Sequence, residues 1–460
     1  MAENMTLTRS LQAILFLLFC GWLYLFIVTP VRMCPDSYGY FADAEHLFEP
    51  GYQTIRPVLF PLFLRVLHNT PLKMSIVAYL VNCASLLYLV ELASGKNRLF
   101  SRRNTIVMIS FLMLVGIWSY CGTYLTESIL LAVQIWIFVF LYKIVFPVKA
   151  PNVLATIGYA MAICVLATTL KPWIMLMVLL TSVFLSIASL AIRSFRPKML
   201  SSFVLLIVAV LSFVVGMRYN RSKSFEKANM VVFMAGSGFE GTLKERITGD
   251  KSLRKEDSVF LAAVLSDIEL ILHKYEQNPW EASKANELRV LNVLDPRYEA
   301  GITKAYRVMY FQRFRDLMGL VGLSLERHFS DLRLDTSCFE IAYGPELPGL
   351  RNLSIILIVG FAVLLLVYQS TRPDPATGRK IGLRPIKNYL RENIQLSIFI
   401  GIILLSGIIF SLLLALAGAF ELKRTNLPAA ICQAIAVAWI VMSYSRSASL
   451  PVKRSPFASV

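Results

Sequence analysis

Charged side chains are scarce in this chain of 460 residues. Only 16% of its residues are Asp, Glu, Lys or Arg, against about a quarter in an ordinary soluble protein. Apolar types make up 56%, and most of the charges lie in a few segments between long apolar runs. The composition therefore excludes a set of soluble domains and predicts an all-α polytopic membrane protein.

Residues for metal or nucleophilic chemistry are also few. The four histidines form no HExxH pattern, no GxSxG pattern occurs, and the seven cysteines show no metal-ligand spacing. These absences argue against a zinc enzyme and against a Ser-His-Asp hydrolase. One GxGxxG match, at 236–241, lacks the alternating strands and helices of a dinucleotide-binding fold, so we expect no nucleotide cofactor there.

What the chain has instead is a series of apolar runs long enough to cross the hydrocarbon core of a bilayer. They predict a bundle of about ten transmembrane helices. The first run lacks a small-residue cleavage site, which indicates an uncleaved helix. The runs cover residues 10–29, 73–93, 104–120, 127–146, 152–170, 173–192, 199–217, 350–368, 393–418 and 427–445.

Basic residues give the chain a net charge of +17. They alternate with apolar runs as membrane topology requires, so we expect no nucleic-acid partner. If the N-terminus is cytosolic, 19 basic residues lie in the connections on that side, and only Lys171, Lys423 and Arg424 lie in the short tips opposite. The 19 are Arg9, Lys96, Arg98, Arg102, Arg103, Lys143, Lys149, Arg193, Arg196, Lys198, Arg372, Arg379, Lys380, Arg384, Lys387, Arg391, Arg446, Lys453 and Arg454.

This topology predicts three parts and places both termini in the cytosol. Residues 1–217 form an N-terminal bundle of about seven helices, with an outward loop at 30–72. Residues 218–349 form a mostly helical extracytoplasmic segment, with amphipathic stretches at 259–275 and 303–332. Residues 350–460 supply about three further helices and a cytosolic tail.

Acidic residues make the first outward loop a candidate site. Asp36, Asp43 and Glu45 lie there among aromatic residues such as Tyr40, beside a membrane surface. Burial and neighbouring charges can tune a carboxylate of this kind into a base. On composition alone, solvated loop carboxylates are the alternative.

A second group of ionisable residues lies at the outward ends of other predicted helices. It consists of Glu127, Lys171, Glu421 and Arg424. Placing a charged side chain at the centre of a membrane span costs about 2.5–3.5 kcal/mol, and less toward its ends. Each of these residues is therefore expected to have a compensating contact or a function. Lysine and arginine can reach the interface along their stems, whereas the stem of Glu127 is short. All four are predicted on the side of Asp36, where one cavity can collect them.

The order of these features resembles the GT-C superfamily of integral membrane glycosyltransferases, which use polyprenyl-phosphate-linked sugars. The superfamily includes bacterial lipid A and protein O-mannosyl transferases. The likeness covers most of 10–217 and 400–445. Its motifs are Asp36, the RP…P stretch from Arg56 and Pro57 to Pro61, Glu127, the step Lys171-Pro172, and the E..R…P run of Glu421, Arg424 and Pro428.

The resemblance implies an inverting transferase with Asp36 as general base. It implies that Arg56, Lys171 and Arg424 bind the donor phosphate. The residues expected to orient substrates are Glu127, Asp43, Glu45, Tyr40 and Glu421. No cofactor is required, although a divalent cation is an alternative. The expected partners are a polyprenyl-phosphate sugar, a glycan, lipid or protein acceptor, and membrane lipids.

We also expect a bacterial inner membrane protein with its active site facing the periplasm, although an endoplasmic reticulum protein would have the same topology. A transporter or flippase for a lipid-linked or amphipathic solute is the rival hypothesis, because it would use the same charges as a pathway. The absence of detectable internal repeats argues against it. A polymerase or ligase of lipid-linked glycans shares the donor chemistry and differs only in its acceptor.

Overall fold

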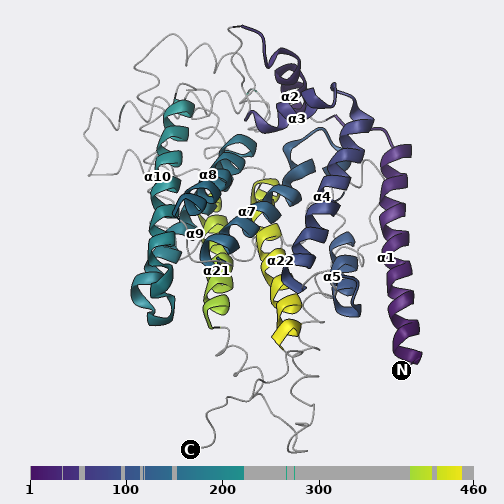
Figure 1. Cartoon of the computed structure of the whole chain (residues 1–460). Helices are drawn as coiled ribbons and strands as arrows, with labels where there is room; N and C mark the ends of the chain where they lie inside the picture. Colours follow the sequence, from purple (N-terminus) through teal and green to yellow (C-terminus); the bar gives the residue numbers. More distant parts are fainter. Residues whose placement is uncertain are drawn as a thin grey trace, which may run out of the picture. The chain divides into compact units, whose positions relative to one another are not determined.

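Helices make up nearly all of the described chain. The computed structural model describes residues 2–33, 35–50, 57–94, 99–113, 118, 120–147, 153–221, 394–416 and 422–447, and the single positions 259, 266 and 274. Figure 1 shows the helices α1 (Ala2–Val28), α2 (Pro35–His46), α3 (Leu59–Val66), α4 (Pro71–Ser94), α5 (Arg102–Leu112), α7 (Leu130–Val145), α8 (Val153–Leu170), α9 (Pro172–Ala191), α10 (Met199–Arg221), α21 (Ile394–Leu416) and α22 (Leu422–Ser447). Three 3₁₀ turns accompany them: η2 (Tyr120–Gly122), η3 (Thr126–Ile129) and η4 (Arg193–Lys198).

The chain divides into two units by its internal contacts. One contains residues 1–213, 333–407 and 427–460, and the other contains 214–332 and 408–426. The contacts described below all belong to the first unit.

Six of the described helical segments are long and apolar enough to cross a membrane. They are Leu7–Val28, Pro71–Ser94, Thr126–Val145, Val153–Leu170, Trp173–Ala191 and Arg193–Val215. Shorter apolar segments lie in α21 and α22. Over the described residues, these helices confirm the prediction of a helical membrane protein.

The predicted count of about ten helices stays a prediction. The run at 350–368 lies outside the described residues. So does the segment 218–349, with its amphipathic stretches at 259–275 and 303–332, apart from the end of α10 and three single positions.

The run at 104–120 is not one span, which corrects the sequence prediction. Helix α5 ends at Leu112 after 11 residues, and a helix of that length rises only about 16 Å. The indole of Trp22 donates to the Leu112 carbonyl at 2.9 Å, and that of Trp118 donates to the Phe111 carbonyl at 2.6 Å. These bonds satisfy two of the carbonyls that every helix C-terminus leaves open, so the helix can stop inside an apolar sequence.

The predicted outward loop at 30–72 contains two short helices, α2 and α3. Pro35 is the first residue of α2 and Pro71 the first of α4. Proline suits the first turn of a helix because its missing N–H would have no partner there. His68 and Asn69 follow α3 with φ of 54° and 52°, and their N–H groups close its last turn. The acidic residues of this segment are thus held on folded backbone.

Helix α7 is the central element of the bundle. Of its apolar window, 78% is buried, against 11% for the window in α1. Its ring of Tyr142 lies 4.6 Å from that of Trp439 in α22, and its Phe138 lies 5.8 Å from Phe399 in α21. The C-terminal helices therefore pack against α7, as Figure 1 shows.

Candidate functional site

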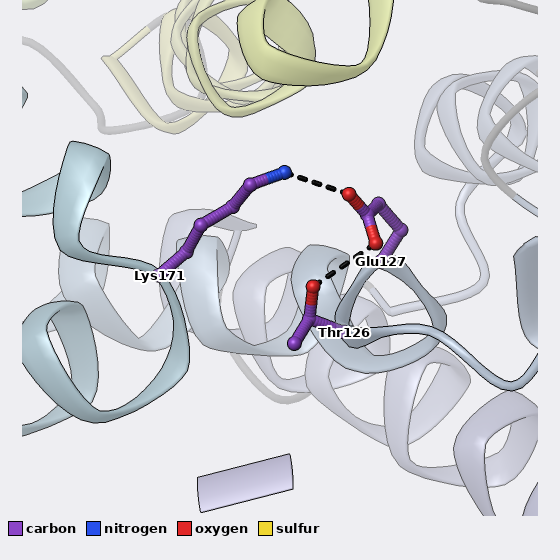
Figure 2. Close-up of polar contacts among 3 residues, drawn as sticks. All are labelled: Thr126, Glu127 and Lys171. Carbon is purple, nitrogen blue, oxygen red and sulfur yellow. Dashed lines mark hydrogen bonds and ion pairs between the residues drawn. The ribbon is translucent and has the colours of Figure 1, made fainter. Parts of the chain in front are cut away.

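An ion pair joins two residues that the sequence analysis singled out, Glu127 and Lys171. The Lys171 Nζ lies 2.6 Å from the Glu127 Oε1, and the hydroxyl of Thr126 donates to the other carboxylate oxygen at 3.0 Å. The glutamate side chain is fully buried and that of the lysine is 13% exposed. Figure 2 shows the two side chains reaching toward each other across the space between their backbones.

The backbone places Lys171 at the junction of two helices. Pro172 is the first residue of α9, and Lys171 itself is extended, with φ −155° and ψ 110°. Its N–H closes the last turn of α8 on the Ala167 carbonyl, and its own carbonyl accepts from Ile174 in the first turn of α9. The predicted helix end at Lys171-Pro172 is confirmed, and proline explains it because the residue before it avoids the helical conformation.

The burial of this pair has a clear energetic meaning. Each charge loses its hydration inside the bundle, and the partner charge and hydrogen bonds compensate for that loss. Removing one member leaves the other charged and buried, which costs about 3–5 kcal/mol. A lysine fixed in this way supplies positive charge at a defined position, which is what a site for an anionic group requires.

A buried amide in α4 contacts the backbone that carries Glu127. Asn82 is 1% exposed, and its Nδ2 donates to the Ser128 carbonyl at 2.7 Å. Its Oδ1 accepts from the N–H of Ala132 at 2.9 Å, and the Cys121 Sγ lies 3.3 Å from Nδ2. The start of α7 is therefore tied to α4 by a side chain 46 residues away.

The chain after α1 is tied to the stretch that precedes Glu127. Arg32 forms a parallel bridge with Thr123, in which its N–H donates to the Gly122 carbonyl at 2.9 Å and its carbonyl accepts from Tyr124 at 3.1 Å. Asp36 lies shortly after this bridge, in the first turn of α2. The backbone thus brings the start of α2 and the η3 turn to the same end of the bundle.

Aromatic rings link α2 and α3 to the same stretch. The ring of Tyr124 lies 6.2 Å from Phe41 and 6.4 Å from Phe60, and Tyr40 meets Phe60 edge-on at 5.1 Å. Burial, with a smaller contribution from the charge of Glu45, raises the pKa of Tyr124 to about 12. This phenol is therefore a neutral hydrogen-bonding group at physiological pH.

The other predicted site residues divide into three groups. Tyr40 and Asp43 are buried in α2, whereas Glu45 on the same helix is exposed. The structure describes the helical backbone of Asp36 and Arg424 but not the positions of their side chains. Arg56 and Glu421 lie outside the described residues. Among the predicted site residues, the structure brings Glu127 and Lys171 into direct contact.

Sequence reasoning missed Asn82, Thr126 and Tyr124. A signal existed for Asn82, because an amide in the middle of an apolar run needs a hydrogen-bonding partner. Its partners lie in another helix, so the run alone does not identify them. Within the described ranges, no group of three or more His, Cys, Asp or Glu residues is arranged to hold a metal ion.

No family model, curated protein or solved structure matches this chain. Its function must therefore be argued from the site itself.

Proposed function

We propose that this protein is an inverting glycosyltransferase that moves a sugar from a polyprenyl-phosphate donor to an extracytoplasmic acceptor. The observation that carries the proposal is the buried ion pair of Glu127 and Lys171, at the end of the bundle to which the start of α2 is tied. A membrane-embedded cation beside a segment that carries carboxylates suits a substrate that arrives from the bilayer with a phosphate group.

The proposed reaction exchanges one bond at the anomeric carbon for another. The acceptor hydroxyl oxygen attacks that carbon from the face opposite the phosphate, and the bond to the phosphate oxygen breaks. Asp36 accepts the hydroxyl proton, and polyprenyl phosphate leaves with the bonding electrons. The configuration of the sugar inverts. A positioned base of this kind contributes about 10² to 10⁴ in rate.

Lys171 and Glu127 have complementary roles in this proposal. Negative charge grows on the departing phosphate, and the Lys171 ammonium stabilises it. An ammonium has three N–H donors, so its bond to Glu127 is compatible with a further contact to a phosphate oxygen. Glu127 fixes the lysine in place, with Thr126 holding the second carboxylate oxygen. Arg56 and Arg424 are proposed as further phosphate ligands, and Tyr40, Asp43, Glu45 and Glu421 as substrate-orienting residues.

The distribution of basic residues supports a location for this chemistry. We propose a bacterial inner membrane, with both termini cytosolic and the Glu127–Lys171 end facing the periplasm. The proposed partners are the lipid-linked donor, a glycan, lipid or protein acceptor, and the surrounding lipids. A divalent cation is an alternative aid to the leaving phosphate.

The test is a transfer assay with purified protein in vesicles and radiolabelled polyprenyl-phosphate sugars. We expect wild-type protein to release polyprenyl phosphate and Asp36→Asn to lower the rate about 10²-fold or more. The double variant Glu127→Gln/Lys171→Met, which removes both charges and leaves no buried charge unpaired, should lower it about 10²-fold or more. Glu49→Gln is the matched control, because Glu49 is an exposed acid just after α2 that pairs with His46 at 2.8 Å.

Several results would reject the proposal. An intact donor that has crossed the vesicle membrane would identify a transporter instead. Full transfer activity in folded Asp36→Asn would remove the general base. Equal rates in the double variant and wild type would leave the pair with a structural role only.

A further inference from the structure

The Asn82 amide replaces a backbone hydrogen bond at the start of α7. In an uninterrupted α-helix the N–H of Ala132 donates to the carbonyl of Ser128, four residues earlier. Here the N–H donates to the Asn82 Oδ1 at 2.9 Å, and the carbonyl accepts from the Asn82 Nδ2 at 2.7 Å. One side-chain amide thus stands between two backbone groups and satisfies both.

This insertion coincides with a change of helix type. Residues Thr126–Ile129 form the 3₁₀ turn η3, and α7 begins only at Leu130. A 3₁₀ turn has three residues per turn rather than about 3.6, so side chains on it point in other directions than they would on a continued α-helix. Glu127 lies on this turn, directly before the carbonyl group that Asn82 holds. The direction of its carboxylate therefore depends on the Asn82 amide.

We propose that Asn82 is a positioning residue that aims the Glu127 carboxylate and, through it, the Lys171 ammonium. The inference deepens the proposed function, on which its catalytic consequence rests. Asn82 lies in the interior of a transmembrane helix, where it forms hydrogen bonds with Ser128, Ala132 and Cys121. We infer that it acts on the site through the backbone of η3, where it holds the Ser128 carbonyl.

The variant Asn82→Leu tests the inference because it can fold without leaving buried backbone groups unpaired. Without the amide, the N–H of Ala132 and the carbonyl of Ser128 can bond to each other, and α7 can extend by one turn. The apolar side chain suits the bundle interior. Glu127 then turns away from Lys171. We expect amine-reactive labelling of Lys171, measured by mass spectrometry, to rise at least about fivefold, because a free amine reacts faster than one held in a buried pair.

Transfer kinetics supply the second readout. We expect the kcat of Asn82→Leu to fall about 10²-fold with a smaller change in the donor KM, because a displaced cation acts mainly on the transition state. Gln134→Leu is the matched control. Gln134 is another fully buried amide, on α7 itself, and it accepts from the Cys432 thiol instead of contacting η3. That variant should keep the wild-type labelling and kcat.

Asn82→Asp adds a pH readout that a role in folding alone would not produce. A protonated carboxyl can accept from Ala132 and donate to Ser128 as the amide does, whereas an ionised one has no donor. The ratio of its kcat to that of wild type should therefore rise as the pH is lowered. A flat ratio, or wild-type labelling and kcat in folded Asn82→Leu, would overturn the inference. If wild-type protein transfers no sugar but Lys171 labelling rises in Asn82→Leu, the proposed function fails and the positioning role stands.

Discussion

The two ends of α7 hold lysines in different ways. At its beginning, Lys171 forms a 2.6 Å ion pair with a fully buried carboxylate. At its end, Lys143 lies 3.3 Å from the Tyr88 hydroxyl and 5.9 and 5.6 Å from the ring centres of Tyr88 and Tyr159. A carboxylate fixes an ammonium at one point, whereas ring faces accept it over a range of positions. The first arrangement suits a site, and the second suits an anchor at the membrane interface.

The largest effect that would separate the two ends is the loss of a single charge from the pair. We expect Lys171→Met to lower the free energy of unfolding by about 3–5 kcal/mol, because Glu127 is then buried without its partner. The double variant Glu127→Gln/Lys171→Met should recover most of that loss. Chemical denaturation of the protein in detergent micelles measures both values. If Lys171→Met were as stable as wild type, the ion pair would not be buried in the folded protein.

An intermediate effect is expected from Tyr124, three residues before Glu127 in the sequence. The pKa of Tyr124 is about 12 in the folded protein and about 10 when unfolded. The folded state thus keeps a proton that the unfolded state releases, so stability is complete below pH 10 and falls as the pH rises from 10 to 12. The loss is at most about 3 kcal/mol, because each pKa unit corresponds to about 1.4 kcal/mol. Unfolding of wild type and Tyr124→Phe from pH 8 to 12 measures it, because the variant lacks this contribution. Parallel curves would contradict a buried phenol.

The smallest effect is expected at the other end of α7. Lys143→Met removes a partly buried ammonium from ring faces and should cost about 0.5–1 kcal/mol, with wild-type transfer activity. Lys143→Arg should be nearly neutral, because a guanidinium also stacks on aromatic rings. Lys171→Arg alters the geometry of the buried ion pair with Glu127 and should lower stability and activity. Denaturation measures the stability of both arginine variants, and the transfer assay measures their activity. Equal losses in Lys143→Arg and Lys171→Arg would remove the distinction between the two ends of α7.

Local patterns predicted the parts of the site that depend on neighbours in sequence. The step Lys171-Pro172 marked a helix junction because proline acts on the residue directly before it. Glu127 was predicted as a site residue because a short acidic side chain at the edge of an apolar run has few ways to reach water. The contact between them follows from the packing of α7 and α8, so sequence could suggest a shared side but not a 2.6 Å pair.

The features that sequence analysis missed depend on partners far along the chain. The run at 104–120 has the composition of a span, yet α5 stops where Trp22, 90 residues away, takes the Leu112 carbonyl. Asn82 resembles any isolated amide in an apolar run until its partners in η3 are known. The segment 30–72 was predicted as an outward loop with no helices of its own, although Pro35 and Pro71 suit helix starts. Composition thus predicted which segments lie in the membrane, while tertiary contacts determine where the helices end.

The ion pair also bears on how the chain is made. Its members are 44 residues apart, so Glu127 leaves the ribosome well before Lys171 does. A lone carboxylate inside an apolar segment opposes transfer of that segment into lipid. Helix α7 ends at Val145 and α8 begins at Val153, so few residues separate them in sequence, and Lys171 follows α8 directly. The two helices are therefore best inserted together as a hairpin, with the lysine neutralising the glutamate as the pair of helices enters the bilayer. The electrostatic contact that defines the site thereby couples the insertion of two helices during biosynthesis.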